Sequence, residues 1–242
     1  MGIKNYIKRH LPGLASSYRY AHSFWTGRRW IGKGMDSFHE IYRKNVWDCP
    51  ETVSGSGSTA EQTQKLRKEL PNLLTRNQIN SVVDAPCGDF NWMKLVDMGS
   101  RQYVGIDLVP ELIESVREKF GSDRRSFLVL DISKALLPKT DLIICRDCFV
   151  HFSNADILAT LRNFKRTNSR FLLTTTYPNH PFNTDCPTGH WRMLNLQLPP
   201  FNFPTPLELL VEECGEGECF ATKSLGLWRL ESVLNRQQVV AL

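Results

Sequence analysis

The chain has 242 residues, of which 41% are hydrophobic and 23% are charged, so it is long and apolar enough to bury a sizeable core. No apolar run reaches the ~20 residues that a membrane-spanning helix needs. The first ten residues also lack the apolar stretch of a signal peptide. This composition excludes a protein built from transmembrane helices, and we expect a cytoplasmic location.

Positive charge is concentrated at the N-terminus. Residues 1–46 carry nine Lys and Arg against two acidic residues, a net charge of +7, which leaves −2 for the rest of the chain. Aromatic residues lie among these charges, namely Tyr6, Tyr18, Tyr20, Phe24, Trp25 and Trp30. We favour an arm that packs its rings on the domain and leaves its charges in water. The second interpretation is binding to an anionic membrane, where the chain would be peripheral, or to polysaccharide machinery; nucleic acid is least favoured.

The seven cysteines include two pairs that lie close in sequence, Cys145 with Cys148 and Cys214 with Cys219. Two such pairs can form a zinc site. Cys145, however, ends the apolar run 142–144, which is typical of a buried strand. We therefore favour buried, reduced thiols over a metal site or a disulfide.

Strand and helix signals alternate along most of the chain. Strands are predicted at residues 81–85, 103–106, 127–130, 142–145 and 171–176, with two antiparallel closing strands at 207–213 and 225–230. Helices are predicted at 37–47, 60–76, 91–96, 110–120 and 156–165. The order predicts an α/β fold with a doubly wound, mostly parallel, seven-stranded Rossmann-like sheet and an N-terminal helical extension.

Two segments stand apart from this alternation. We expect residues 1–59 to form the basic, aromatic extension, ending in a lid loop rich in Gly and Ser, and residues 60–242 to form the main domain. Residues 177–206 contain seven prolines and are predicted to be an insertion within that domain.

An acidic residue stands at the carboxyl end of each of the first three predicted strands: Asp84, Asp107 and Asp131. The carboxyl ends of parallel strands meet at one edge of a sheet, where ligands bind. An acid after the second strand can accept hydrogen bonds from ribose hydroxyls, and one after the third can accept from an adenine amino group while Ile132 packs on the ring. Gly88 lets the backbone approach a ligand closely. The pattern predicts a nucleoside site, although its single glycine does not make the G-x-G-x-x-G of dinucleotide binders.

The segments 84–88, 105–107, 130–132 and 141–151 resemble the four motifs of class I S-adenosylmethionine-dependent methyltransferases. The resemblance covers roughly residues 60–230 and implies methyl transfer from S-adenosylmethionine. In that family the first loop cradles the methionine part, the second acid holds the ribose and the third motif holds the adenine, roles that fall to Gly88, Asp107 and Asp131. Pro86 and Phe90 stand where glycines are commoner, which predicts a stiffer loop. The cofactor-binding candidates are Asp84, Pro86, Cys87, Gly88, Asp107, Leu108, Asp131, Ile132, Arg146 and Thr59.

The sequences of four segments are similar to those of a bacterial methyltransferase subgroup, namely residues 84–92, 145–148, 174–176 and 199–201. That subgroup is associated with surface-polysaccharide and glycosyltransferase gene clusters. The similarity implies a glycan, sugar or sugar-nucleotide acceptor methylated on a hydroxyl, and a glycosyltransferase as a candidate partner.

Asp147 and His151 are the candidate catalytic residues. They lie four residues apart, which places both on one face of a helical turn. Methylation of a hydroxyl requires removal of its proton, for which a His of near-neutral pKa, with or without a carboxylate partner, is suited. The structural alternative is that His151 bonds a backbone carbonyl and Asp147 only orients a loop. Some related O-methyltransferases hold a divalent cation in this helix, but Val150 stands where an acid would be needed, so we expect no metal.

The candidate acceptor residues lie in the Pro-rich insertion and are Tyr177, Asn179, His190, Trp191 and Arg192. Aromatic rings beside polar groups suit a sugar, whereas Arg192 suits a phosphate or carboxylate. The alternative is a structured loop without substrate contact. Ser58 and Thr59 are expected to close over the cofactor. Two other functions stay open: N-methylation of a small amine or protein, and a non-catalytic cofactor-binding partner of a glycosyltransferase, which the intact acids disfavour.

Overall fold

The computed structural model describes residues 34–213 and 221–234. The aromatic arm before residue 34, the cysteines Cys214 and Cys219, and the turn at 215–217 lie outside the described residues. Within the described ranges, none of the helices combines the length and the apolar character that a bilayer span requires.

Seven strands and four α-helices make up the regular structure of the described residues. The strands are β1 (Ser81–Asp84), β2 (Gln102–Asp107), β3 (Arg125–Val129), β4 (Leu142–Cys145), β5 (Phe171–Thr176), β6 (Glu208–Val211) and β7 (Ser224–Arg229). The α-helices are α3 (Ser37–Arg43), α4 (Gln64–Arg76), α5 (Pro110–Phe120) and α6 (Asn154–Arg166). Short 3-10 turns occupy Gly34–Asp36, Ser56–Ser58, Met93–Leu95, Phe149–His151 and Leu230–Ser232.

The strands form one sheet in the order β3-β2-β1-β4-β5-β7-β6. Neighbours from β3 to β5 pair in parallel, whereas β7 runs antiparallel to both β5 and β6. The order reverses between β1 and β4, where β1 has β2 on one side and β4 on the other. The predicted Rossmann-like fold is therefore confirmed, including the antiparallel closing strands.

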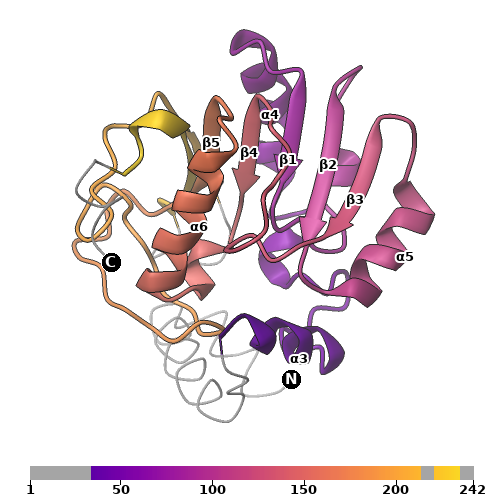
Figure 1. Ribbon diagram of the computed structural model, residues 1–242, viewed down its shortest axis with the longest axis horizontal. Helices are drawn as coiled ribbons and strands as arrows, with labels where there is room; N and C mark the ends of the chain where they lie inside the picture. Colours follow the sequence, from indigo (N-terminus) through magenta and orange to yellow (C-terminus); the bar gives the residue numbers. More distant parts are fainter. Residues whose placement is uncertain (1–33, 214–220, 235–242) are drawn as a thin grey trace.

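Helices cover both faces of the sheet (Figure 1). On one face, α4 and α5 contribute residues such as Leu70 and Ile113 to a core that includes Val82 of β1. On the other face, α6 packs Leu161 against a core that includes Val83 of the same strand. Because consecutive strand residues point to opposite faces, a central strand such as β4 is apolar throughout and buried on both sides.

The described part of the N-terminal extension belongs to the fold. In Figure 1, α3 lies beyond the arrowheads of the strands, at their carboxyl ends. Its Ile41 is buried, and Phe38 packs against the core on the α6 side of the sheet. Helix α3 therefore lies over the carboxyl edge of the sheet, and the domain boundary at residue 59 stays a prediction.

Three predicted helices are shorter than expected. The helix predicted at 37–47 ends at Arg43, and the helix predicted from residue 60 begins at Gln64. Residues 91–96 form only the 3-10 turn Met93–Leu95. The carboxylate of Glu51 accepts from the N–H of Ala60 and from the side chain of Asn91 (both 2.7 Å), so it joins the starts of the last two segments.

Candidate functional site

A pocket lies at the carboxyl ends of the strands, between the sheet and the segment that carries α3 and the lid loop. The turns after the first three strands provide one wall, with residues Pro86, Cys87, Gly88, Asp107, Leu108, Asp131 and Ile132. The N-terminal segment provides the cover, with Met35, Phe38, Ile41, Tyr42, Trp47, Val53, Ser54 and Ser58. The segment after β4 adds Arg146, Asp147, Cys148, His151 and Phe152. The structure thus brings most of the predicted cofactor and catalytic residues together.

The turn after β1 places backbone rather than side chain at the pocket. Gly88 has a φ of +54°, a conformation that favours glycine. A Cβ atom built on Gly88 would lie 2.2 Å from Oγ of Ser54, so no larger residue fits beneath the lid loop. Phe90 also has a positive φ, of 61°, and packs its ring edge-on against Phe127 in the core. The turn is therefore shaped by Gly88 and anchored by Phe90.

Asp107 is placed to accept hydrogen bonds from a ligand. Its Oδ2 accepts from the N–H of Gly88 (3.2 Å) and its Oδ1 from that of Val109 (3.1 Å). Each carboxylate oxygen can accept two bonds, so each retains acceptor capacity. Burial raises the pKa of Asp107, although these backbone N–H groups oppose the shift. The pair of oxygens matches the two hydroxyls of a ribose.

Asp131 is held more tightly and is less buried. Its Oδ1 accepts from the backbone and the hydroxyl of Ser133 (2.9 and 2.6 Å), and its Oδ2 pairs with Lys134 (2.9 Å). Burial opposes ionisation, but the bonds from Ser133 and Lys134 outweigh it and lower the pKa. Asp131 lines the pocket next to Ile132, which is buried.

Asp84 differs from the other two acids, because it does not line the pocket. It is 1% exposed and its Oδ2 accepts from the hydroxyl of Tyr103 (2.7 Å), which is itself buried. Burial raises the pKa of Asp84 to about 7. The expectation of direct cofactor contact is corrected here: Asp84 lies beneath the turn and faces the core, where Tyr103 satisfies it.

The lid loop is fastened to the first turn by Asp89. Its Oδ1 accepts from the hydroxyls of Thr52 (2.9 Å) and Ser54 (3.0 Å), and its Oδ2 from the N–H of Val53 (3.1 Å). In return, the N–H of Asp89 donates to Oγ of Ser54 (3.2 Å). Ser58 lines the pocket as predicted, but Thr59 does not. The hydroxyl of Thr59 instead donates to the carbonyl of Ser56 (3.0 Å), so that prediction is corrected too.

A cluster of four charges lies between the pocket and the closing strands. Arg146 donates to Glu212 (2.6 Å) and contacts Asp147 (3.2 Å). Lys223 bridges the same two acids, at 2.6 Å from Asp147 and 3.3 Å from Glu212. Arg146 also donates to the carbonyl of Gly57 in the lid loop (2.8 Å). The four side chains, which we call the charge cluster, connect the turn after β4 to β6, β7 and the lid.

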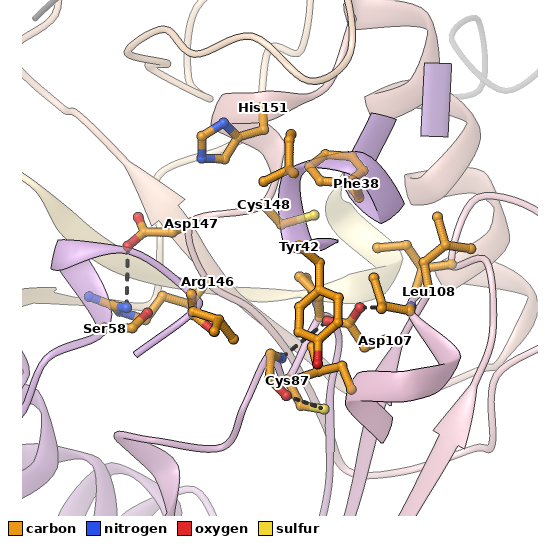
Figure 2. Close-up of a pocket in the computed structure, with 18 of the residues that line it drawn as sticks. Phe38, Tyr42, Ser58, Cys87, Asp107, Leu108, Arg146, Asp147, Cys148 and His151 are labelled. Atoms are coloured by element: carbon orange, nitrogen blue, oxygen red, sulfur yellow. Dashed lines mark hydrogen bonds and ion pairs between the residues drawn. The ribbon is translucent and has the colours of Figure 1, made fainter. Parts of the chain in front are cut away.

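Asp147 is a poor base in this setting. Burial opposes its ionisation, but Arg146 and Lys223 outweigh burial and lower the pKa to about 2. The φ of Asp147 is 50°, so it precedes the Phe149–His151 turn in a left-handed conformation. The predicted helical face shared with His151 is therefore wrong in its geometry, although both residues do line the pocket. In Figure 2 they lie away from Asp107 and Leu108.

His151 presents one nitrogen that is free to act as a base. Its Nδ1 lies 2.9 Å from the backbone carbonyl of His190, and because a carbonyl only accepts, Nδ1 carries the proton. Nε2 of the neutral ring then holds a lone pair. Burial lowers the pKa of His151 to about 4, against the opposing effects of that carbonyl and of Asp147. The imidazole is therefore neutral at physiological pH.

The five predicted acceptor residues do not line the pocket. Arg192 is 3% exposed and its guanidinium donates to the carbonyls of Thr184 and Phe149 (2.9 and 3.1 Å), so it holds the Pro-rich segment rather than an anion. Tyr177 is buried and packs with Val150, with Trp191 against them.

The other two predicted acceptor residues also lie outside the pocket. Asn179 is exposed, and His190 reaches the site only through its carbonyl. The Pro-rich segment thus contacts His151 through the backbone carbonyl of His190. The prediction that its five residues line the acceptor site is corrected, because none of them lines the pocket.

Several residues at the site carry no signal in the sequence. Trp47, Glu212 and Lys223 belong to no motif that we recognised, and Asp89 lies in the recognised segment 84–92 without a predicted role. Only their positions in the fold reveal what they contact. The one available hint in the sequence was that Glu212 and Lys223 are charged residues near the ends of the two predicted closing strands. Among residues 34–213 and 221–234, no group of three potential metal ligands occurs, and Cys87, Cys145 and Cys148 are buried free thiols.

Residues 82–169 match a family described as a methyltransferase domain. A search among curated proteins finds no match to this sequence.

Similar solved structures share the fold. The 1,6-didemethyltoxoflavin-N1-methyltransferase of Burkholderia thailandensis superposes with a TM-score of 0.56 at 14% identity, over 88% of this chain and 89% of that one. An S-adenosylmethionine-dependent methyltransferase of Clostridium acetobutylicum gives 0.52 at 13% identity, over 80% and 98%. The N-methyltransferase NodS of Bradyrhizobium japonicum gives 0.52 at 13% identity, over 70% and 96%. At these identities the likeness establishes the fold alone.

The matched domain and the site agree. The chain carries a Rossmann-like methyltransferase domain, it is an S-adenosylmethionine-dependent methyltransferase, and S-adenosylmethionine is its cofactor. The residues present fit that cofactor: Asp107 retains acceptor capacity for two hydroxyls, Leu108 and Ile132 offer apolar contact, and Gly88 lines the same pocket.

Proposed function

We propose that the protein is an O-methyltransferase that acts on a hydroxyl of a sugar, a sugar nucleotide or a surface glycan. The observation that carries the proposal is the state of His151. Its Nδ1 proton is engaged by the carbonyl of His190, burial keeps the ring neutral, and Nε2 is left to accept a proton at the pocket. A hydroxyl needs this help more than an amine does, because its proton must leave as the oxygen attacks.

The residues of the chain divide the work of such a reaction. S-adenosylmethionine supplies a methyl group on a positively charged sulfur. Asp107, Asp131 and Gly88 are the groups that would bind and orient the nucleoside part. His151 takes the acceptor proton at Nε2, and the lid loop keeps water from the reacting atoms. Orientation of two substrates in one pocket supplies much of the rate enhancement.

The charge cluster supports this division of roles. Asp147 is engaged by both Arg146 and Lys223, which leaves His151 as the better proton acceptor of the two candidates. The negative charge of Asp147 instead raises the pKa of His151, which favours protonation of the imidazole during the reaction.

Two further expectations belong to the same proposal. The similarity of residues 84–92 and 145–148 to a polysaccharide-associated subgroup supports a surface-glycan pathway, with a glycosyltransferase as partner. The net charge of +7 over residues 1–46 is the reason for the second interpretation of the N-terminal extension, binding to the anionic inner face of a membrane. Vesicle co-sedimentation with and without anionic lipid would test the latter.

The competing function is N-methylation of a small amine or protein. Relatives in fold include enzymes named as N-methyltransferases, from Burkholderia thailandensis and Bradyrhizobium japonicum. A third function, cofactor binding without catalysis, would leave the neutral His151 without a task.

Methyl transfer from labelled S-adenosylmethionine separates these functions. The purified full chain is incubated with a panel of methyl glycosides, sugar nucleotides and primary amines, and the labelled products are identified by mass spectrometry. Methylation of glycosides or sugar nucleotides on oxygen is expected. Labelling of amines alone would contradict the proposal, and tight cofactor binding with no transfer would favour the non-catalytic partner.

A further inference from the structure

Trp47 is a large aromatic side chain that lines the pocket while remaining 36% exposed. The other tryptophan of the pocket, Trp92, is 6% exposed and packs in the core, with the guanidinium of Arg146 5.4 Å from its ring centroid. An indole left open at a ligand pocket loses the stabilisation that full burial would give it. Among the described residues, part of the indole is therefore left open to a ligand ring at this pocket.

The backbone around Trp47 is shaped to hold this side chain at the pocket. After α3 ends at Arg43, successive turns are closed by hydrogen bonds such as Val46 N–H to the carbonyl of Ile41 (3.1 Å). Asn45 and Asp48, on either side of Trp47, have φ values of 44° and 45°. Left-handed conformations are costly for non-glycine residues and least so for Asn and Asp. Strain of this kind tends to occur at functional sites.

Two neighbours fix the orientation of the indole. Its Cβ and Cγ lie 3.4 and 3.5 Å from where a Cβ on Gly55 would be, so the lid loop packs against its base. Its ring centroid lies 5.4 Å from that of His151, at an interplanar angle of 39°. A ring stacked on the exposed part of Trp47 would therefore sit beside the proposed base.

The groups nearby suit a sugar. Ser58 and Asp147 line the same pocket and offer hydroxyl and carboxylate oxygens to hydroxyl groups. A pyranose has an apolar face of C–H groups that packs on an aromatic ring and a rim of hydroxyls that needs such polar partners. The Pro-rich segment, where the sequence placed the acceptor, contributes none of its predicted residues to this lining.

We propose that Trp47 is the stacking platform of an acceptor site for a pyranoside, and that it presents one sugar hydroxyl to Nε2 of His151. The inference rests on the proposed O-methyltransferase function and names its acceptor site. It moves acceptor recognition from the Pro-rich segment to the N-terminal segment that covers the cofactor edge of the sheet.

Saturation-transfer NMR on the full chain loaded with S-adenosylhomocysteine tests the site directly. The probes are methyl β-D-glucopyranoside, methyl α-D-mannopyranoside and methyl α-L-rhamnopyranoside, with acyclic glycerol as the control ligand. The variants are Trp47→Ala, Trp47→Phe and, as the control in the Pro-rich segment, Trp191→Ala. Calorimetry with S-adenosylhomocysteine verifies that each variant is folded and keeps its cofactor affinity within about twofold.

The expected result is saturable binding of at least one pyranoside to the wild type and to Trp191→Ala. Trp47→Ala should weaken that binding at least tenfold, and Trp47→Phe should restore part of it, as expected when a contact with an aromatic ring face is lost and then partly replaced. Equal binding by Trp47→Ala and the wild type would overturn the platform, as would the absence of pyranoside binding to the wild type. Binding that depends on Trp47 without methyl transfer from labelled S-adenosylmethionine would overturn the proposed function and leave the platform standing.

Discussion

The chemistry of single residues in this pocket depends on which lone pairs the fold leaves available. Asp147 has its Oδ2 shared between Arg146 and Lys223, whereas His151 has only Nδ1 engaged. The two candidate bases predicted from the sequence therefore differ in how many of their lone pairs are already engaged. Asp107 and Asp84 differ in the same way, because only Asp107 turns acceptor capacity toward the pocket.

We expect His151→Ala to lower methyl transfer about 100-fold or more, the range typical of a lost general base, while cofactor affinity stays unchanged. Because a base must be unprotonated and burial lowers the pKa of His151 to about 4, wild-type kcat/KM should fall only below about pH 4. A pH–rate profile checks this, with His180→Ala, outside the pocket, as the control. A limb near pH 6.5 would contradict the assignment.

Asp107→Ala should weaken binding of S-adenosylhomocysteine by about 1–3 kcal/mol, the cost of leaving buried donors unpaired. The same change at Asp123, an exposed residue, serves as the control. Isothermal titration calorimetry measures both. Unchanged affinity in Asp107→Ala would remove this carboxylate from the nucleoside site.

At the scale of elements, the closing strands do more than complete the sheet. β6 and β7 place Glu212 and Lys223 immediately beyond their pocket-side ends, where both contact the turn after β4. Glu212 is 2% exposed and Lys223 is 4% exposed, so the charges are buried and depend on one another. Through Arg146 and the carbonyl of Gly57, the same cluster reaches the lid loop.

Glu212→Gln should lower the free energy of unfolding by about 3 kcal/mol, because it leaves buried cations short of a counter-charge. The adjacent Glu213 offers a matched control: it pairs with Lys65 (2.5 Å) but its side chain is 67% exposed. Glu213→Gln should change stability by less than about 1 kcal/mol, since exposed pairs contribute little. Urea denaturation compares the two, and equal effects would show that the charge cluster is not stabilised as the structure implies.

At the scale of the whole molecule, the buried acid beneath the site links folding to pH. Burial raises the pKa of Asp84 to about 7, so the folded chain keeps a proton there between about pH 4 and 7 that the unfolded chain releases. The contribution of Asp84 to stability is therefore largest below about pH 4 and is lost as the pH rises toward 7. His151 acts in the opposite direction, since its folded pKa is lowered and its unfolded form gains a proton first as the pH falls.

Asp84→Asn should isolate this dependence, because Asn retains an acceptor for Tyr103 but does not titrate. The free energy of unfolding of the wild type, relative to that of Asp84→Asn, should decrease by up to about 4 kcal/mol between pH 4 and 7, at about 1.4 kcal/mol per pH unit. Thermal and denaturant unfolding at several pH values measure the difference. A difference that does not vary with pH would place the pKa of Asp84 near its ordinary value.

Local patterns in the chain were enough to predict the fold and the cofactor edge. Apolar runs of four to six residues, each followed by an acid or a small-residue turn, predicted β1 to β4 and placed Gly88, Asp107 and Asp131 at one edge. Such signals can be read in sequence because strand burial and turn geometry depend on residues close together in the chain. The antiparallel closing strands were predictable for the same reason.

The acceptor side depends on contacts between distant parts of the chain. Arg146 meets Glu212 across 66 residues, Lys223 meets Asp147 across 76, and Thr52 reaches Asp89 across 37. A local sequence pattern does not predict such long-range contacts. It also does not show which carboxylate oxygen already accepts a hydrogen bond from a neighbouring residue. Packing alone turned Asp84 toward Tyr103, sent Arg192 to backbone carbonyls and brought Trp47 beside His151, because burial and competition for hydrogen bonds are settled only when the chain has folded.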